Sequence, residues 1–180
     1  MKNLIPALCF LLLLTACEKD AEELPEATQT GANTFGARLD GALWTPQHFT
    51  SLGSSTILEA LYTGSGDLLI NARNFKSSPN ETEFEIFIKN IAGPGTYPLN
   101  QPTAKYPLQS ASYGYYIKRK FMPLNEWMTN ATYPGSITIS RIDTAAGVVS
   151  GTFAFNAACI DSSAGPITVT EGRFDIKLSN

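Results

Sequence analysis

The sequence predicts an all-β fold: an antiparallel β-sandwich or barrel-like domain that follows a signal peptide and a disordered tether. Three observations predict it. Short runs rich in β-branched and aromatic residues recur over residues 35–180. Turn residues such as Asp40-Gly41 separate these runs at intervals of about 8–12 residues. None of the runs has a convincing helical periodicity.

Residues 1–16 have the pattern of an export signal peptide. Lys2 precedes an apolar run over residues 4–14, which is shorter than the roughly 18 apolar residues of a membrane-spanning helix. The sequence Leu14-Thr15-Ala16-Cys17 then resembles the lipobox of bacterial lipoproteins. That resemblance implies a lipid on the Cys17 thiol and cleavage just before it, so that Cys17 attaches the chain to a membrane. The alternative is an ordinary secretory signal with an accidental cysteine.

Residues 17–34 are predicted to be a flexible tether. Five acidic residues and one lysine follow Cys17 here, together with Pro, Gly and Thr, which is a composition typical of disorder. The acidic start, residues 18–23, resembles the export signal of surface lipoproteins of Bacteroidota; the alternative is a generic solvated linker. We therefore expect lipid anchoring in the outer membrane and display on the cell surface, with the periplasmic face as the alternative.

The charge of the remaining chain is balanced. The whole sequence has 13 basic and 16 acidic residues, and without residues 1–26 the numbers are 11 and 11. Nucleic-acid binding needs a net basic surface, so we expect no nucleic-acid partner. With Cys9 removed in the signal and Cys17 lipidated, Cys159 has no internal disulfide partner. Burial at a strand end is favoured for Cys159 over a reactive thiol or a bond to a partner.

The first half of the domain reads as hairpins and an edge strand. Asp40-Gly41 joins strand-like residues 35–39 to 42–45, and Gly64-Ser65-Gly66-Asp67 joins 57–63 to 68–74. Residues 83–89 alternate, with Glu83 and Glu85 opposite the apolar set, but Phe87 interrupts the polar face and predicts that part of it is covered. Two further pieces complete this half, an edge-like strand at 96–99 and a strand at 111–118.

The second half contains a hairpin and a long irregular strand. Residues 136–142 and 148–156 flank a loop and form the hairpin. Along residues 167–178 the apolar side chains change from odd to even positions, which one straight strand with a single buried face does not allow. An inserted residue near Glu171-Gly172, a β-bulge, restores the pattern.

Four pieces of sequence, taken in order, resemble an uncharacterised lipoprotein family of Bacteroidota. Members of that family look like a lipobox, a short linker and one β-rich domain, so the resemblance implies this architecture but no activity and no catalytic residue. The four pieces are residues 39–44, 95–99, 150–155 and 168–174.

The landmarks in these pieces also have structural interpretations. Gly41 suits a turn, Gly151 close packing and Gly172 the bulge. The aromatic landmarks are expected in the core: Trp44, Tyr97, Phe153 and Phe174.

Catalytic, metal and cofactor patterns are absent from the sequence, so we predict none of these sites. His48, the one histidine, lies after Pro46 with no nucleophile-elbow motif and no metal-ligand spacing around it. Glu83 and Glu85 share a strand face, and a hydrolase that uses this carboxylate pair is the alternative function.

One stretch has the residue types of a binding surface. Tyrosines and a tryptophan offer stacking faces, and a basic trio would pair with acidic groups; the alternative is a strand that buries alternate tyrosines beside a solvated loop. In addition, Asp143-Thr144-Ala145 resembles an O-glycan acceptor of Bacteroidota, with Thr144 as the acceptor and a simple turn as the alternative. The candidate binding residues are Tyr113, Tyr115, Tyr116, Lys118, Arg119, Lys120 and Trp127.

These observations favour a non-enzymatic, lipid-anchored binding or accessory module. The expected partners are the membrane, through lipid on Cys17, and a glycan, a peptide or another envelope protein. A purely structural envelope protein is a further alternative.

Overall fold

The computed structural model describes residues 23–48, 56–119 and 125–179. The predicted lipidation site Cys17 and the candidate binding residue Lys120 lie outside these ranges. The described residues form strands and no helix, and none of them belongs to a helix that would cross a membrane. The strands are β1 (Thr34–Leu39), β2 (Ala42–Trp44), β3 (Leu58–Tyr62), β4 (Leu68–Asn74), β5 (Thr82–Ile88), β6 (Gly95–Leu99), β7 (Tyr113–Lys118), β8 (Asn125–Met128), β9 (Gly135–Asp143), β10 (Val148–Cys159) and β11 (Ile167–Ser179).

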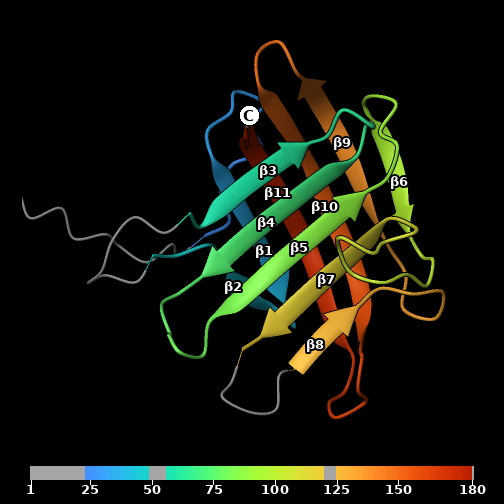
Figure 1. The fold of residues 1–180 in the computed structure, drawn as a ribbon. Coiled ribbons are helices and arrows are strands. Elements are labelled where there is room, and N and C mark those ends of the chain that lie inside the picture. The colour runs from blue at the N-terminus through green and yellow to red at the C-terminus, as the bar shows by residue number, and fades with distance from the viewer. Residues whose placement is uncertain (1–22, 49–55, 120–124, 180) are drawn as a thin grey trace, which may run out of the picture.

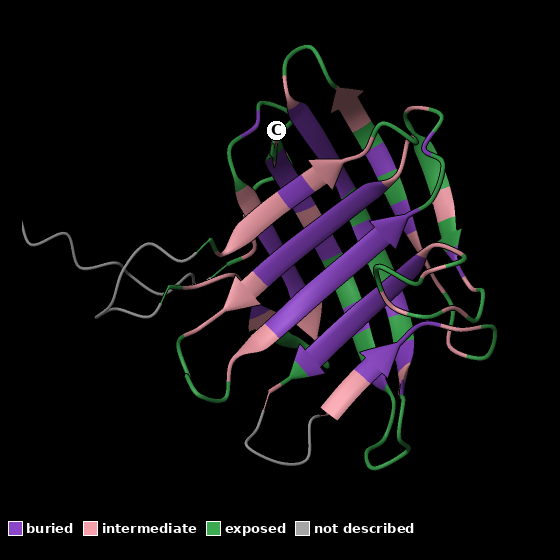
Figure 2. Cartoon of the chain, viewed as in Figure 1, coloured by how far each residue is buried: buried purple, intermediate pink, exposed green. Residues whose placement is uncertain are grey.

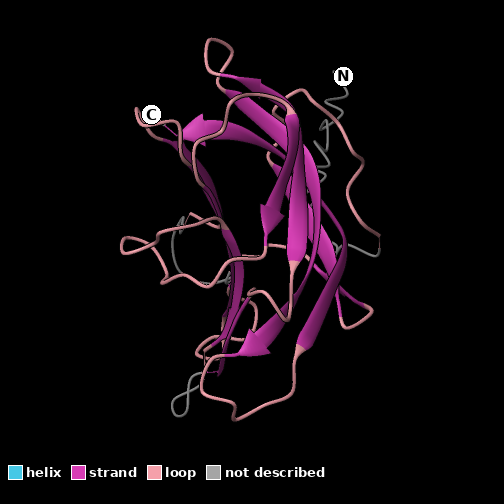
Figure 3. Cartoon of the chain, turned by 90° about the vertical axis from the view of Figure 1, so that its right-hand side faces the viewer, coloured by secondary structure: helices cyan, strands magenta, loops and turns pink. Residues whose placement is uncertain are grey.

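The strands form two layers that pack face to face (Figures 1 and 3). Sheet A has the order β2-β1-β11-β10-β9-β6, and sheet B has the order β3-β4-β5-β7-β8. The two long strands connect the layers at their ends, where Leu178 of β11 pairs with Ala60 of β3 and Ala158 of β10 pairs with Met128 of β8. All pairings between named strands are antiparallel except β11–β3. The predicted all-β, sandwich-like fold class is confirmed.

The core between the sheets is rich in aromatic rings. Buried positions lie along strands of both layers (Figure 2). Phe84 of β5 lies at its centre, with ring centroids 4.7 Å from Trp44 and 4.9 Å from Tyr116. Phe35 and Phe153 bring sheet A into the same cluster, with centroids 5.1 Å apart. Offset and edge-on ring pairs of this kind stabilise a core by more than their buried area alone. Trp44, Phe153 and Phe174 are buried as predicted, and Tyr97 is partly buried against the cluster.

The predicted β-bulge is present in β11. Phe153 of β10 pairs with Gly172, but Phe155 pairs with Val169, so that two residues of β11 oppose one residue of β10. Glu171 takes the strained position, with φ of 53°. The extra residue keeps Val169 and Phe174 on the same buried face, which explains the change in the apolar pattern.

Turn and glycine chemistry follow the sequence closely. Asp40 and Gly41 have φ of 49° and 83°, as a tight hairpin turn between β1 and β2 requires. A Cβ on Gly151 would lie 2.2 Å from the backbone oxygen of Thr138, so this glycine allows β9 and β10 to approach closely.

Sheet B is covered on its outer face as well, as the interruption at Phe87 predicted. Phe87 stacks on Tyr113 of β7, with centroids 5.7 Å apart. Residues 100–112, which connect β6 to β7, lie over this face: the Tyr106 amide donates a 2.8 Å hydrogen bond to the Tyr113 hydroxyl. A second apolar cluster therefore lies outside sheet B, made of Leu69, Phe87, Tyr113, Tyr115, Ile117 and Met128.

The predicted flexible tether, residues 17–34, is corrected over residues 24–33, whereas residues 17–22 lie outside the described ranges. Residues 24–33 are docked on the outer face of sheet A. Hydroxyl and amide groups of this segment donate hydrogen bonds to the buried carboxylate of Asp175. Asp175 accepts hydrogen bonds from the Thr28 hydroxyl at 2.6 Å and from the amides of Gly31 and Ala32 at 2.8 and 3.1 Å. A composition typical of disorder does not reveal such a distant partner.

Candidate functional site

The candidate binding stretch is divided between two environments. Tyr113 and Tyr115 point to the outer face of sheet B, whereas Tyr116 and Trp127 lie in the core between the sheets. All four rings are less than 10% exposed, so they do not form one exposed aromatic surface. The physical reason is the two-residue alternation of β7, combined with the cover that residues 100–112 provide.

The basic residues of the stretch also separate. Lys118 is exposed at the end of β7, whereas Arg119 donates a 3.0 Å hydrogen bond to Glu83 of the neighbouring strand. That guanidinium is therefore committed to an ion pair within the domain.

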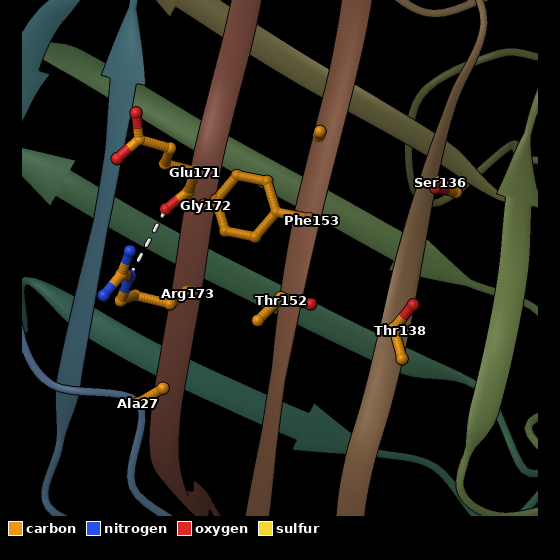
Figure 4. Close-up of a pocket in the computed structure, with 9 residues that line it drawn as sticks. Ala27, Ser136, Thr138, Thr152, Phe153, Glu171, Gly172 and Arg173 are labelled. Atoms are coloured by element: carbon orange, nitrogen blue, oxygen red, sulfur yellow. Dashed lines mark hydrogen bonds between the residues drawn. The ribbon is translucent and has the colours of Figure 1, made fainter.

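A pocket with a volume of about 420 Å³ opens instead on the outer face of sheet A (Figure 4). It lies over β9, β10 and β11, and Ala27 of the docked segment contributes one edge. Pockets of small-molecule sites have volumes in the same range. We call it the outer pocket; it is lined by Ala27, Ser136, Thr138, Thr152, Phe153, Ala154, Glu171, Gly172 and Arg173.

Hydroxyl groups form a row across this pocket. Thr138 pairs in register with Thr96 of β6 on one side and with Thr152 of β10 on the other. Thr152 in turn pairs with Arg173 of β11. Side chains opposite each other on neighbouring strands lie about 5 Å apart, so the row is continuous. The hydroxyls of Thr96 and Thr138 are hydrogen-bonded at 2.9 Å.

The bulge in β11 supplies the charged end of the row. Glu171, at the bulge, is exposed and forms an ion pair with Arg38 of β1 at 3.3 Å. Arg173 donates to the backbone oxygen of Glu171 and to that of Pro25 in the docked segment, both at 3.4 Å. Figure 4 shows Arg173 on one side of Thr152 and Thr138 on the other. The outer pocket thus offers hydroxyls and one guanidinium at an open surface.

Gly172 contributes to the same pocket by lacking a side chain. A Cβ there would lie 2.5 Å from the Phe153 ring, which packs beneath it. The glycine thus makes room for the ring of Phe153, a core residue that is also among those lining the pocket.

The carboxylate pair lies on the other sheet, beneath the covered face. Glu83 is held by Arg73 at 3.3 Å and by Arg119 at 3.0 Å. Glu85 accepts a 2.5 Å hydrogen bond from the Tyr113 hydroxyl, and its second oxygen lies 3.7 Å from Lys105 Nζ. Burial raises the pKa of Glu85, and the hydrogen bond from Tyr113 only partly opposes this.

The other singled-out residues lie apart from both faces. His48 is exposed after β2, and Cys159 is buried at the end of β10, as predicted for a strand end. The Cys159 thiol donates a 3.0 Å hydrogen bond to Asp161. Thr144 is exposed in the turn between β9 and β10. Within the described ranges, no group of three or more His, Cys, Asp or Glu side chains is arranged to hold a metal ion.

The outer pocket was not predicted from the sequence. Its signal was present in the solvent-facing positions of the last strands, where hydroxyl residues such as Ser136, Thr138 and Thr152 alternate with core residues. Threonine is common in strands for its β propensity alone, so this alternation does not distinguish a site from an ordinary surface.

Comparison with known proteins identifies the family of the chain. The sequence profile of a family described as a domain of unknown function (DUF6252) matches residues 32–175. No curated protein and no solved structure matches the chain.

Proposed function

Because the chain belongs to the DUF6252 family, whose function is unknown, its role is inferred from its own residues, and we propose that it is a lipid-anchored, non-enzymatic binding module of the outer membrane. We place its ligand site in the outer pocket. The observation that carries the binding proposal is the row of hydroxyls that leads to Arg173 in this open pocket.

The anchor is supported by the sequence and by the docked segment. Leu14-Thr15-Ala16-Cys17 has the order of a lipobox, and the docked part of the chain begins only a few residues later. Seven peptide steps separate Cys17 from Leu24, and at the full extension of a peptide chain they span at most about 25 Å. A lipid on Cys17 would hold Leu24, where the docked segment begins, at most about that distance from the bilayer surface.

The ligand that fits the outer pocket best is a glycan. Sugars present many hydroxyl groups, and the threonine and serine hydroxyls of the pocket donate and accept hydrogen bonds alike. Arg173, whose Nε and Nη1 atoms donate to Glu171 and Pro25, adds a positive charge that suits a carboxylate or phosphate substituent on such a sugar.

Lipid attachment is tested by labelling cells with radioactive palmitate and separating the inner and outer membranes. We expect label on the wild-type protein in the outer-membrane fraction and none on Cys17→Ser. Protease treatment of intact cells then distinguishes display on the surface from the periplasmic face. Equal membrane recovery of an unlabelled Cys17→Ser variant would contradict the anchor.

Ligand binding is tested by screening the full-length chain in detergent against bacterial glycans. A Thr138→Val, Thr152→Val double variant removes two pocket hydroxyls without changing side-chain volume, and we expect at least a tenfold loss of affinity. Thr168→Val, an exposed position of β11 outside the pocket, is the matched control. If a glycan binds the double variant as tightly as the wild type, the outer pocket is not the binding site. If no glycan binds the wild type, the proposal that the ligand is a glycan is refuted.

A second candidate function is hydrolysis by Glu83 and Glu85. The observation that favours it is the raised pKa of the buried Glu85, as a general acid requires. Both carboxylates are already bound to side chains of the domain, which favours binding over catalysis. Turnover of any glycoside that disappears in Glu85→Gln and in Glu83→Gln would establish the hydrolase instead.

A further inference from the structure

Lys105 occupies a small, well-defined environment on the outer face of sheet B. Its ammonium group lies 3.7 Å from Glu85 Oε2 and 4.4 Å from the centroid of the Tyr115 ring. A carboxylate and an aromatic face are the two groups that most favour an organic ammonium ion. The Lys105 side chain is 37% exposed, so the place that it fills opens to solvent.

The surrounding polar groups are not fully used by Lys105. Asn71, Glu85 and Tyr115 pair in register across β4, β5 and β7, so their side chains lie next to one another. They are 7%, 6% and 0% exposed. The Asn71 Oδ1 atom is buried without a hydrogen-bond partner among the described residues. Buried polar atoms nearly always have a partner, so this oxygen is available to a ligand.

The local charges favour a cation at this place. Glu83, two residues away on β5, is paired with Arg73 and Arg119. Glu85 has Lys105 as its only cationic partner in the described chain, and Tyr113 is a neutral donor. Without the Lys105 ammonium, a buried carboxylate would have no counter-ion, which is costly.

We propose that this face of sheet B is a binding site for a primary organic ammonium group, and that Lys105 occupies the site as an internal substitute for the ligand. A ligand ammonium would displace that of Lys105, keep the contacts with Glu85 and Tyr115, and donate an additional hydrogen bond to Asn71 Oδ1. The site lies on the opposite sheet from the outer pocket and does not depend on the function proposed for that pocket.

The test deletes most of the Lys105 side chain and supplies the deleted part as a small molecule in solution. Lys105→Ala retains the Cβ atom and removes three methylenes and the ammonium, so n-propylammonium supplies the missing atoms. We expect n-propylammonium to raise the melting temperature of full-length Lys105→Ala saturably and to shift the NMR resonances of the Tyr115 ring. n-Propanol, which has the same length and no charge, should do neither. Lys118→Ala, which removes an exposed lysine of β7, should not respond to n-propylammonium.

Two further variants separate the site from a general salt effect. In Lys105→Ala the additional change Glu85→Gln, or separately Asn71→Leu, should reduce the affinity for n-propylammonium at least tenfold. Circular dichroism confirms that each variant is folded. An equal response of Lys105→Ala and Lys118→Ala, or an unchanged affinity in either folded double variant, would overturn the proposal.

The wild-type chain shows whether the site accepts an outside ligand. Titration with cadaverine and with a blocked Gly-Lys-Gly peptide, followed at the Lys105 side-chain ammonium by NMR, tests a free amine and a peptide lysine as sources. Displacement of the Lys105 signal by either ligand supports the site and identifies its source. If neither displaces Lys105, the contact is only an internal ion pair and the ligand proposal is refuted.

Discussion

The Thr28 hydroxyl donates a 2.6 Å hydrogen bond to Asp175 Oδ2, which joins the beginning of the described chain to its last strand. Ser150 donates to the other carboxylate oxygen at 2.7 Å from the neighbouring strand β10. Burial of Asp175 opposes its ionisation, but the hydrogen bonds from Ser150, Thr28 and the amides of the docked segment outweigh it and lower the pKa. One ionised carboxylate therefore organises residues 24–33.

Replacing this carboxylate is predicted to release the segment. Asp175→Asn replaces one accepting carboxylate oxygen with an NH2 group, which would face the hydroxyl and amide donors that now bind Asp175. We therefore expect a loss of about 3 kcal/mol in the free energy of unfolding at pH 7. Hydrogen exchange should become fast at the Gly31 and Ala32 amides, which donate to Asp175. Glu171→Gln, an exposed carboxylate on the same strand, is the control and should leave these amides protected.

The same carboxylate predicts a pH dependence. Because the pKa of Asp175 is lower in the folded state, its stabilising effect is complete above the unfolded value of about 4 and is lost as the pH falls further. The stability difference between the wild type and Asp175→Asn, measured by urea unfolding, should therefore shrink below pH 4. A difference that stays constant down to pH 2 would contradict this account.

Glu85 is predicted to behave in the opposite way. Burial raises the pKa of Glu85, so ionisation is less favourable in the folded than in the unfolded chain, and its contribution to stability falls as the pH rises above about 4.5. The free energy of unfolding of Glu85→Gln, relative to the wild type, should therefore increase between pH 4 and pH 7. Tyr113→Phe, which removes the 2.5 Å hydrogen bond to Glu85, should raise that pKa further and steepen the trend.

Close approach of β9 and β10 depends on Gly151. The Cβ of Gly151→Ala would meet the backbone oxygen of Thr138, which belongs to the sheet and cannot move independently. We expect a loss of about 3 kcal/mol in thermal or chemical unfolding. Gly165→Ala is a suitable control, since a Cβ there meets no atom within 4 Å, and it should change stability by less than about 0.5 kcal/mol.

Much of sheet A was predictable because its features are local in sequence. The Asp40-Gly41 turn needs two residues with positive φ, and the bulge near Glu171 is visible as a change of apolar phase within one strand. Both follow from backbone geometry that a few neighbouring residues determine. The alternation around Glu83 similarly showed that Phe87 needs a cover, although it did not identify residues 100–112 as that cover.

The remainder depends on contacts between distant residues. The docked segment has the composition of a tether, and the residues that hold it are distant in sequence, as Asp175, 147 residues beyond Thr28, illustrates. Tyr113 and Tyr115 resemble a binding surface in the sequence because nothing near them indicates that they are buried. The short strand β8 was not predicted: β2 is shorter still, but the Asp40-Gly41 turn marks it, whereas no Asp-Gly turn adjoins β8.

The aromatic core provides the last prediction. Phe84 is fully buried and its ring lies within about 6 Å of those of Trp44, Tyr116 and Phe153, so it joins both sheets. Phe84→Ala would remove the shared ring and leave a cavity that the rigid neighbouring strands cannot fill, and we expect a loss of about 4 kcal/mol. Leu108→Ala is the control, because Leu108 is 80% exposed, and it should leave the unfolding midpoint unchanged. A loss below about 1 kcal/mol for Phe84→Ala would mean that the two sheets are stabilised mainly by their strand pairings at the ends of β10 and β11, and that the aromatic cluster contributes little to holding the layers together.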